Sequence, residues 1–219
     1  MVSRLMACPW RATTVGTMGN DHYFTASPES VQKTTELRLT LRGHSVVMNS
    51  VSGTFSPGSL DKGTAVLINN ATPPPPAGTF LDIGCGWGPL AATLALESPA
   101  AQVWGIDVNE RALDVARENM NALGLSGVHI TTPEGIPEGV SFELIWSNPP
   151  IKVGKAELHR ILSTWLPRLT PQGEAWLVVA TKLGGDSLQQ WLNDGGAGEL
   201  KAQRATTSKG YRLLKVTRA

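Results

Sequence analysis

Beyond residue 77 the sequence alternates between short apolar runs and longer amphipathic segments, and no other feature limits the fold as strongly. The apolar runs predict seven strands, at 79–83, 102–107, 128–131, 142–147, 174–180, 199–205 and 211–217. Segments between them predict helices, at about 89–97, 110–123, 155–166 and 186–191. Strands that alternate with helices form a mostly parallel sheet covered on both faces. We therefore predict an α/β fold with a seven-stranded, doubly wound sheet.

The sequence before residue 77 follows a different pattern. Residues 34–51 alternate polar and apolar side chains and break at Arg42-Gly43-His44, which predicts a β-hairpin. A loop and a short apolar helix follow, and the prolines at 73–76 form a stiff connector. We expect residues 21–76 to form an N-terminal hairpin and covering segment, and residues 77–219 to form the main domain.

The first twenty residues contain basic side chains and no acid. They lack the apolar stretch of a secretory signal, and Pro9, Gly16 and Gly19 are incompatible with a helix. We expect Met18 to be the natural start and residues 1–20 to be disordered.

Composition excludes several classes of protein. No apolar run approaches the roughly 20 residues that a membrane span needs, so we expect no membrane association. The two cysteines, Cys8 and Cys85, lie in unlike contexts and predict neither a disulfide framework nor a metal cluster. This usage fits a cytoplasmic protein without a metal.

Charge is distributed unevenly along the chain. Residues 1–149 carry 8 Lys and Arg against 13 Asp and Glu, a net charge of −5, whereas residues 150–219 carry 11 against 5, a net charge of +6. The basic C-terminal third is either a solvated face or a surface for a polyanion such as nucleic acid.

The first strand of the predicted sheet ends in FLDIGCGWGPL. We expect Gly84, Gly86 and Gly88 to form a tight turn that brings the backbone close to a ligand, with the carboxylate of Asp82 before it. Ligands of such sheets bind beyond the carboxyl ends of the strands. The spacing differs from the G-x-G-x-x-G of dinucleotide binders, and Asp82 would repel a pyrophosphate but not an ammonium group.

The second predicted strand ends at Asp107, where a carboxylate can accept two hydrogen bonds from a ribose diol. Dinucleotide-binding enzymes share this acid. Asp107 therefore predicts a ribose in the ligand without identifying the ligand.

The fourth predicted strand, FELIWS, ends in Asn148-Pro149-Pro150, where neither proline can donate a backbone hydrogen bond. Taken alone, the motif is simply a turn, because proline cannot continue a strand ladder and Asn with Pro starts loops. Its place after the glycine turn, Asp82 and Asp107 favours a functional site instead.

Together these motifs resemble class I S-adenosylmethionine-dependent methyltransferases, whose seven-stranded, Rossmann-like sheet has its last strand antiparallel. The resemblance implies that S-adenosyl-L-methionine is the cofactor. The loop from Gly84 to Gly88, with Cys85 and Gly86 inside it, would hold the methionine moiety with help from Asp82. Asp107 would hold the ribose, and Val108 would lie against the adenine.

Within that family, N-P-P is typical of enzymes that methylate a planar nitrogen. Such a nitrogen is a poor nucleophile until it is oriented, because its lone pair is delocalised. The resemblance implies that the side-chain oxygen of Asn148 and the backbone carbonyl of Pro149 accept the two N–H hydrogens. Pro149 and Pro150 would keep this geometry rigid.

The segment GTFSPGSLDKGT is similar to the GVFS…LDxGS segment of RsmC-type ribosomal RNA guanine methyltransferases. In that family it helps to cover the cofactor, which would involve Phe55, Ser56, Asp61 and Thr64. The chain resembles a short, one-domain branch of this superfamily. The implied substrate is an exocyclic amine of a base in structured RNA, and within this superfamily the resemblance points to guanine of small-subunit (16S) ribosomal RNA.

Several side chains are candidates for contacts with the RNA, and Ile151 stands where many N-P-P enzymes place Tyr or Phe to stack on the target base. The remaining candidates are basic: Lys152, Lys155, Lys182, Lys209 and Arg212. Two alternatives stay open. One is a glutamine amide of a protein, the substrate of release-factor methyltransferases; the other is a non-catalytic, cofactor-binding factor in ribosome assembly.

Overall fold

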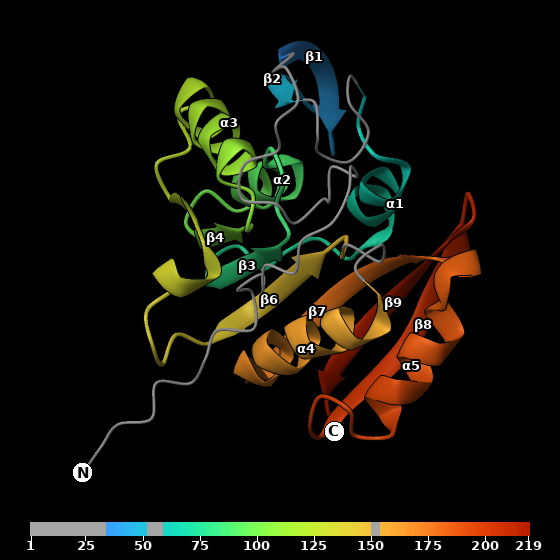
Figure 1. Ribbon diagram of the computed structural model, residues 1–219. Helices are drawn as coiled ribbons and strands as arrows, with labels where there is room; N and C mark the ends of the chain where they lie inside the picture. Colours follow the sequence, from blue (N-terminus) through green and yellow to red (C-terminus); the bar gives the residue numbers. More distant parts are fainter. Residues whose placement is uncertain (1–33, 52–58, 150–153) are drawn as a thin grey trace, which may run out of the picture.

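The computed structural model describes residues 34–51, 59–149 and 154–219 of the chain. Within these ranges the predicted α/β fold is confirmed (Figure 1). No helix in this part of the chain is long and apolar enough to cross a membrane.

The central sheet has seven strands in the order β5-β4-β3-β6-β7-β9-β8. All neighbouring pairs from β5 to β7 are parallel, and β9 runs antiparallel to both β7 and β8. The last strand is thus the antiparallel one, as the resemblance implied. The strands are β3 (Thr79–Ile83), β4 (Gln102–Ile106), β5 (Val128–Thr131), β6 (Phe142–Ser147), β7 (Leu169–Ala180), β8 (Leu200–Ser208) and β9 (Tyr211–Arg218).

Helices cover both faces of this sheet (Figure 1). On one face lie α1 (Lys62–Asn70), α2 (Pro89–Glu97) and α3 (Glu110–Ala122), and on the other lie α4 (Lys155–Trp165) and α5 (Gly185–Asn193). Short 3₁₀ turns follow β5, α4 and β7, at η1 (Pro133–Gly135), η3 (Leu166–Arg168) and η4 (Thr181–Leu183). The sheet is therefore doubly wound, and its two sides have separate hydrophobic clusters.

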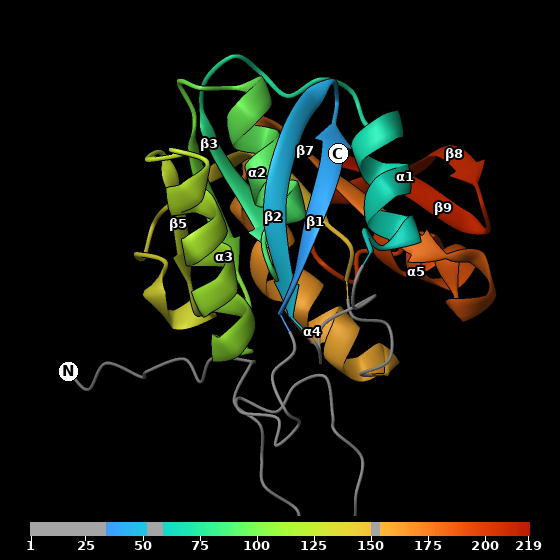
Figure 2. The ribbon, with the colours of Figure 1, turned by 90° about the horizontal axis from the view of Figure 1, so that it is seen from above.

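The predicted hairpin forms a second sheet of its own, with β1 (Thr34–Leu41) antiparallel to β2 (His44–Val51) around the turn at Arg42-Gly43. Seen from above, it lies between α3 and α1 (Figure 2). The buried amide of Asn119 on α3 ties it down: Oδ1 accepts from Asn49 N at 2.8 Å, and Nδ2 donates to Asn49 O and to Trp87 O, both at 2.9 Å. One side chain thus joins the hairpin, α3 and the loop after β3.

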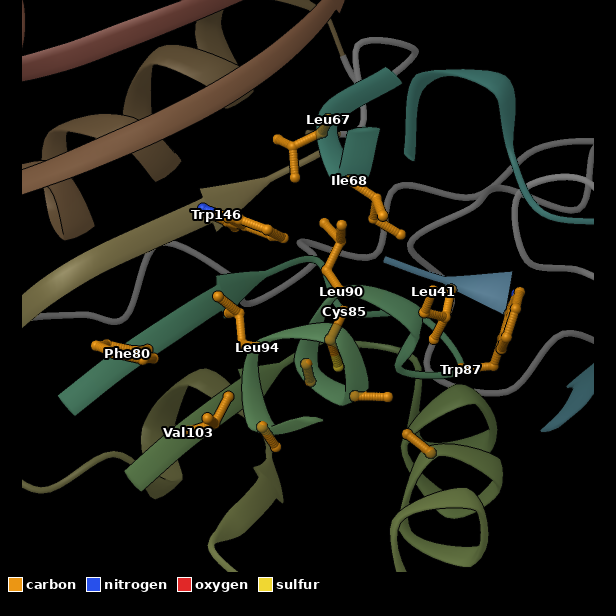
Figure 3. Packing of buried hydrophobic residues seen from close by; sticks show 14 of the residues in the cluster. Leu41, Leu67, Ile68, Phe80, Cys85, Trp87, Leu90, Leu94, Val103 and Trp146 are labelled. Atoms are coloured by element: carbon orange, nitrogen blue, oxygen red, sulfur yellow. The ribbon is translucent and has the colours of Figure 1, made fainter. Parts of the chain in front are cut away.

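The hydrophobic core also crosses the boundary expected near residue 77. Leu41 of the hairpin and Leu67 and Ile68 of α1 belong to the same buried cluster as Trp87 and Trp146. Figure 3 shows Leu41 beside Trp87, and the two α1 side chains on the same side of the sheet as Trp146. Residues 34–51 and 59–76 are therefore packed onto the main domain and share its core.

The largest departure from the predicted elements is the start of β7, which begins at Leu169 rather than at residue 174. Its pairing with β6 shifts register between Phe142 and Leu144, so the early part of β7 is an irregular extension. Pro171 lies in this extension, and proline is tolerated in strands only at edges and bulges. Its presence made the segment look like a loop in the sequence.

Candidate active site

Three strand ends that carry the predicted motifs meet at one edge of the sheet. Ile83 at the end of β3 pairs with Ile106 on β4 and with Ser147 on β6. The hydroxyl of Ser147 donates to Ile83 O at 2.8 Å and fastens the β3 and β6 ends together. The glycine turn, Asp107 and Asn148 therefore leave the sheet side by side, where doubly wound sheets bind their ligands.

The glycine turn is held against β4 by its backbone. Gly84 N and Cys85 N both donate to Ile106 O, at 2.8 and 2.9 Å, and Gly88 forms the N-cap of α2. Gly86 adopts φ +54°, and a Cβ built on it would have no atom within 4 Å. Left-handed φ values favour glycine, and the open space lets a ligand approach the backbone here. These features fit the predicted cofactor loop.

Asp82 is completely buried at the end of β3. Its Oδ2 accepts a hydrogen bond from Ala91 N at 3.0 Å, whereas its Oδ1 is buried without a partner among the described residues. Burial is the main reason why the pKa of Asp82 is raised to about 8, and the nearby charge of Asp107 adds to the rise. A carboxyl group in this state gains most from a cationic ligand.

Asp107 follows β4 and is also buried. Its Oδ2 accepts from Gly86 N and its Oδ1 from Asn109 N, both at 2.9 Å. Burial raises the pKa of Asp107, and these backbone N–H groups oppose the rise. An ionised carboxylate has about four acceptor positions, so the backbone bonds from Asn109, Gly86 and Val108 leave capacity for a hydroxyl of a ribose. Val108, expected to lie against the adenine, is half-buried at the same strand end.

The residues present fit S-adenosylmethionine. This cofactor carries an ammonium and a sulfonium group, and two buried carboxyl groups lie beside an open glycine turn. Cys85 does not compete as a nucleophile: burial, followed by the charges of Asp82 and Asp107, raises the pKa of its thiol well above the usual range. Among the described residues, no three side chains of His, Cys, Asp or Glu gather as a metal ion would require.

Asn148 follows β6 and is half-buried, with Pro149 buried behind it. Its Nδ2 donates to Asp61 Oδ1 at 2.7 Å and to Thr64 Oγ1 at 3.0 Å. The resemblance led us to expect Asp61 and Thr64 on the cofactor. In the structure these two hydrogen bonds join the start of α1 to the N-P-P motif.

Tyr211 is a site residue that the sequence did not single out. It starts β9, and its ring lies so close to Gly63 that a Cβ built on Gly63 would be 2.9 Å from its Cε1. Partial burial, with the charge of Asp61, raises the pKa of its hydroxyl. Only the strand order, with β9 next to β7, brings it here, so no local sequence pattern could have found it.

The predicted contacts with RNA differ in accessibility. Lys155 at the start of α4, Lys182 in η4 and Lys209 in the β8–β9 turn are all exposed. The last two lie near each other, because Thr181 donates to Gly210 O from both its N and its Oγ1, at 2.9 and 3.0 Å.

The environment of Arg212 does not favour the expected contact with phosphate. Its side chain is only 6% exposed, and its Nη1 donates a hydrogen bond to the exposed carboxylate of Asp186. A buried guanidinium that already has an acidic partner is not presented to a phosphate. The remaining predicted site residues, Phe55, Ser56, Pro150, Ile151 and Lys152, lie outside the described residues.

A family model described as methyltransferase small domain matches residues 45–213. The chain is 32% identical over 178 residues to the uncharacterized protein YbxB of Bacillus subtilis, a match that covers 80% of this chain and 89% of that protein. It is 34% identical over 206 residues to ribosomal RNA small subunit methyltransferase C of Pseudomonas entomophila, covering 90% of this chain and 58% of that protein. The chain thus spans little more than half the length of the second relative.

Among solved structures, the T. thermophilus 16S rRNA N2 methyltransferase RsmC, in complex with AdoMet and guanosine, superimposes with a TM-score of 0.70. The match covers 88% of this chain and 52% of that one, at 21% sequence identity. At this identity the likeness establishes the shared fold.

Proposed function

This chain belongs to the methyltransferase small domain family, and we propose that it methylates an exocyclic amine of guanine in small-subunit ribosomal RNA. The methyltransferase family inferred from the sequence is thereby confirmed. S-adenosylmethionine is the cofactor of that family.

One structural observation carries the proposal: Asn148 and Pro149 leave β6 directly beside the glycine turn that leaves β3. The pairing of Ile83 with Ser147 brings the two strand ends into register. A group held by Asn148 is therefore held next to the methyl donor. A surface turn, the simplest interpretation of N-P-P, would have no reason to occupy this place.

The side chains of the site then have defined tasks. S-adenosylmethionine supplies an electrophilic methyl group when bound. The oxygen of Asn148 and the carbonyl of Pro149 accept the two N–H hydrogens of the target amine, which directs its lone pair toward the methyl carbon. The N–C bond forms as the S–C bond breaks, and the surplus proton on nitrogen passes to solvent. Orientation supplies the rate enhancement, so no charged base is needed.

Structured RNA is the substrate that agrees best with the surroundings of the site. Two exposed lysines, Lys182 and Lys209, lie at the same edge of the sheet as Tyr211. The relative from Pseudomonas entomophila is a ribosomal RNA methyltransferase by name. A base in folded RNA would have to leave its stack to reach Asn148, as in other enzymes that modify bases.

The test replaces Asn148 by Ala, which removes the acceptor oxygen and keeps both prolines. We expect turnover to fall by about 100- to 1000-fold, by analogy with the loss of one oxyanion-hole donor. Methyl transfer from labelled S-adenosylmethionine to small ribosomal particles that lack the modification measures it, together with cofactor titration and thermal melting. Asn69→Ala is the matched control, because Asn69 lies on the exposed side of α1.

The outcomes separate the open alternatives. Lost turnover with normal cofactor binding and melting supports the proposal, and equal loss of turnover and folding supports the turn. Label that enters a protein glutamine points to the release-factor type of substrate. If the wild-type chain binds cofactor and particles but transfers no label to any of them, it is an assembly factor.

A further inference from the structure

The start of α1, Asp61-Lys62-Gly63-Thr64, turns its polar groups toward Asn148, 87 residues further along the chain. We propose that Asp61, Gly63 and Thr64, called here the α1 clamp, are positioning residues that fix the amide of Asn148 with its oxygen facing the target amine. The inference rests on the proposed function of Asn148, and it gives the LDKGT segment a role different from covering the cofactor.

The hydrogen-bond chemistry fixes which end of the Asn148 amide faces the clamp. An ionised carboxylate can only accept, so the nitrogen of the amide must face Asp61 Oδ1, which lies 2.7 Å from it. The second N–H goes to Thr64 Oγ1 at 3.0 Å. An amide nitrogen has two N–H donors, and the clamp uses both. The oxygen is then turned away from these two acceptors and lies next to Gly63, where the proposal has it meet the N–H groups of a substrate.

Asp61 holds this position because it is also the N-cap of α1. Its Oδ1 accepts from Gly63 N at 2.7 Å and from Thr64 N at 3.1 Å, in addition to the amide of Asn148. N-cap bonds satisfy backbone donors that a helix start leaves without partners. The carboxylate is therefore locked to the helix backbone, and the orientation of Asn148 is locked to α1.

Gly63 lets α1 approach closely enough for these bonds. A Cβ at this position would lie 3.1 Å from Asn148 Oδ1, 3.0 Å from Asp61 Oδ1 and 2.9 Å from the Tyr211 ring. The 2.9 Å distance is shorter than real Cβ contacts and the other two are unusually tight, so a larger residue would displace either the helix start or these side chains. Asp61, Gly63 and Thr64 thus all contribute to the contact between α1 and Asn148.

The clamp also strengthens the acceptor. Donating an N–H to a carboxylate draws electron density toward the amide oxygen, because hydrogen bonds in a chain polarise one another. The N–H groups of the amine become more acidic as the new N–C bond forms. An amide oxygen polarised in this way binds those N–H groups more strongly in the transition state than in the ground state, which raises turnover rather than substrate affinity.

The first test reads the amide of Asn148 directly, without substrate or cofactor. In ¹⁵N-labelled full-length protein, the side-chain NH₂ signals of Asn148 are those that disappear in Asn148→Ala. We expect Thr64→Val to shift them and to speed their hydrogen exchange by about threefold to tenfold, the equivalent of one neutral hydrogen bond. Thr64→Ser, which keeps the hydroxyl, should leave them near their wild-type values.

The second test separates turnover from binding with the same variants. Thr64→Val should lower kcat by about threefold to tenfold, and Asp61→Asn, which keeps an N-cap but loses the charge, by about tenfold to a hundredfold. The KM for S-adenosylmethionine should stay within about twofold, and Thr64→Ser should restore kcat. Thr93→Val is the matched control, since Thr93 is also buried on a helix but bonds to Pro89 O.

Each result bears on the clamp. Shifted Asn148 signals with lowered kcat and an unchanged KM support it. Unchanged signals in a folded Thr64→Val protein overturn it, and so does an increase in the KM for S-adenosylmethionine with normal kcat, because that result returns Thr64 to the cofactor. If the wild-type protein shows these signals but methylates nothing, the proposed function fails while the fixed orientation of the amide stands.

Discussion

At the scale of single residues, Asp82 is the most unusual group in the site. It is buried beside a second acid, and one of its oxygens has no described partner. A group in this state destabilises the folded protein whenever the pH favours its charged form. The arrangement makes sense if a ligand with a positive charge relieves it.

The pH dependence of stability tests this account of Asp82. Its pKa rises from 3.8 to about 8 on folding, so between these values the folded state keeps a proton that the unfolded state has lost. The unfolding free energy should therefore fall as pH rises through this window, by at most about 1.4 kcal/mol per unit. Without cofactor, Asp82→Asn should be more stable than the wild type at pH 7.5, and the gap should narrow at pH 5.

Denaturant unfolding at the two pH values measures the gap, and calorimetry measures cofactor affinity. We expect the more stable Asp82→Asn protein to bind S-adenosylmethionine more weakly, because its amide cannot pair with an ammonium group. Asp114→Asn, at an exposed carboxylate on α3, is the control and should change neither property. Parallel stability curves for Asp82→Asn and the wild type would contradict this account, because they would mean that folding does not raise the pKa of Asp82.

At the scale of elements, the hairpin and the glycine turn are coupled through α3. Asn119 replaces the strand partner that β2 would have on that side, because it bonds both the N–H and the C=O of Asn49. Its third bond goes to Trp87 O, inside the glycine turn. A displacement of the hairpin should therefore also displace the glycine turn.

Replacing Asn119 by Ala should lower the free energy of unfolding by about 2 to 3 kcal/mol, because the buried carbonyl of Trp87 and the partly buried backbone groups of Asn49 lose their partner. Cofactor affinity should fall as well. Denaturant unfolding and cofactor titration give the two values. Asn121→Ala, at an exposed position of the same helix, should leave both near wild type. Loss of stability with unchanged affinity would mean that the hairpin and the cofactor loop are independent.

At the scale of the whole molecule, the charge asymmetry of the sequence has a place in the fold. The acidic part carries Asp82 and Asp107, which we propose hold the cofactor. The basic part contributes exposed lysines near Tyr211, at the end of β7 and in the β8–β9 turn. A cationic cofactor and an anionic substrate would thus approach from regions of opposite charge.

If the basic region binds RNA, affinity should decline steeply as salt increases. Lys182→Ala should reduce the slope of log affinity against log salt concentration by about 1, the value for one lost phosphate contact. Lys201→Ala removes the same charge from the start of β8, which pairs with Thr217 at the opposite end of β9 from Tyr211, and should leave the slope unchanged. Equal effects of both substitutions would indicate a diffuse charge effect without a defined RNA path.

Local patterns were enough to predict much of this structure. The bounds of β3, β5, β6 and α2 agree with the sequence to the residue, because their apolar runs end at glycine, proline or polar residues. The strand ends that carry Asp82, Asp107 and Asn148 followed from the alternation of strands and helices. The features predicted best are therefore the bounds of strands and helices, which depend on residues that are neighbours along the chain.

Contacts between distant residues were not predictable in this way. Nothing in LDKGT or N-P-P shows that Asp61 and Asn148 share a hydrogen bond, because the contact depends on how α1 packs on the sheet. From the sequence, Arg212 was predicted to contact phosphate. Its burial could not be foreseen, because it depends on the position of β9 beside Asp186. The resemblance indicated which residues belong to the candidate site. Their hydrogen-bond and ion-pair partners became known only from the three-dimensional structure.

The order of strands in the second half of the sheet has a consequence for synthesis on the ribosome. β8 emerges before β9, yet it pairs with β9, which in turn pairs with β7. Until β9 emerges and enters between them, the outer edge of β7 offers its backbone to any other extended chain. A nascent chain stopped at Lys209 would already contain Asp61, Asp82, Asp107 and Asn148, but it would still be prone to aggregation.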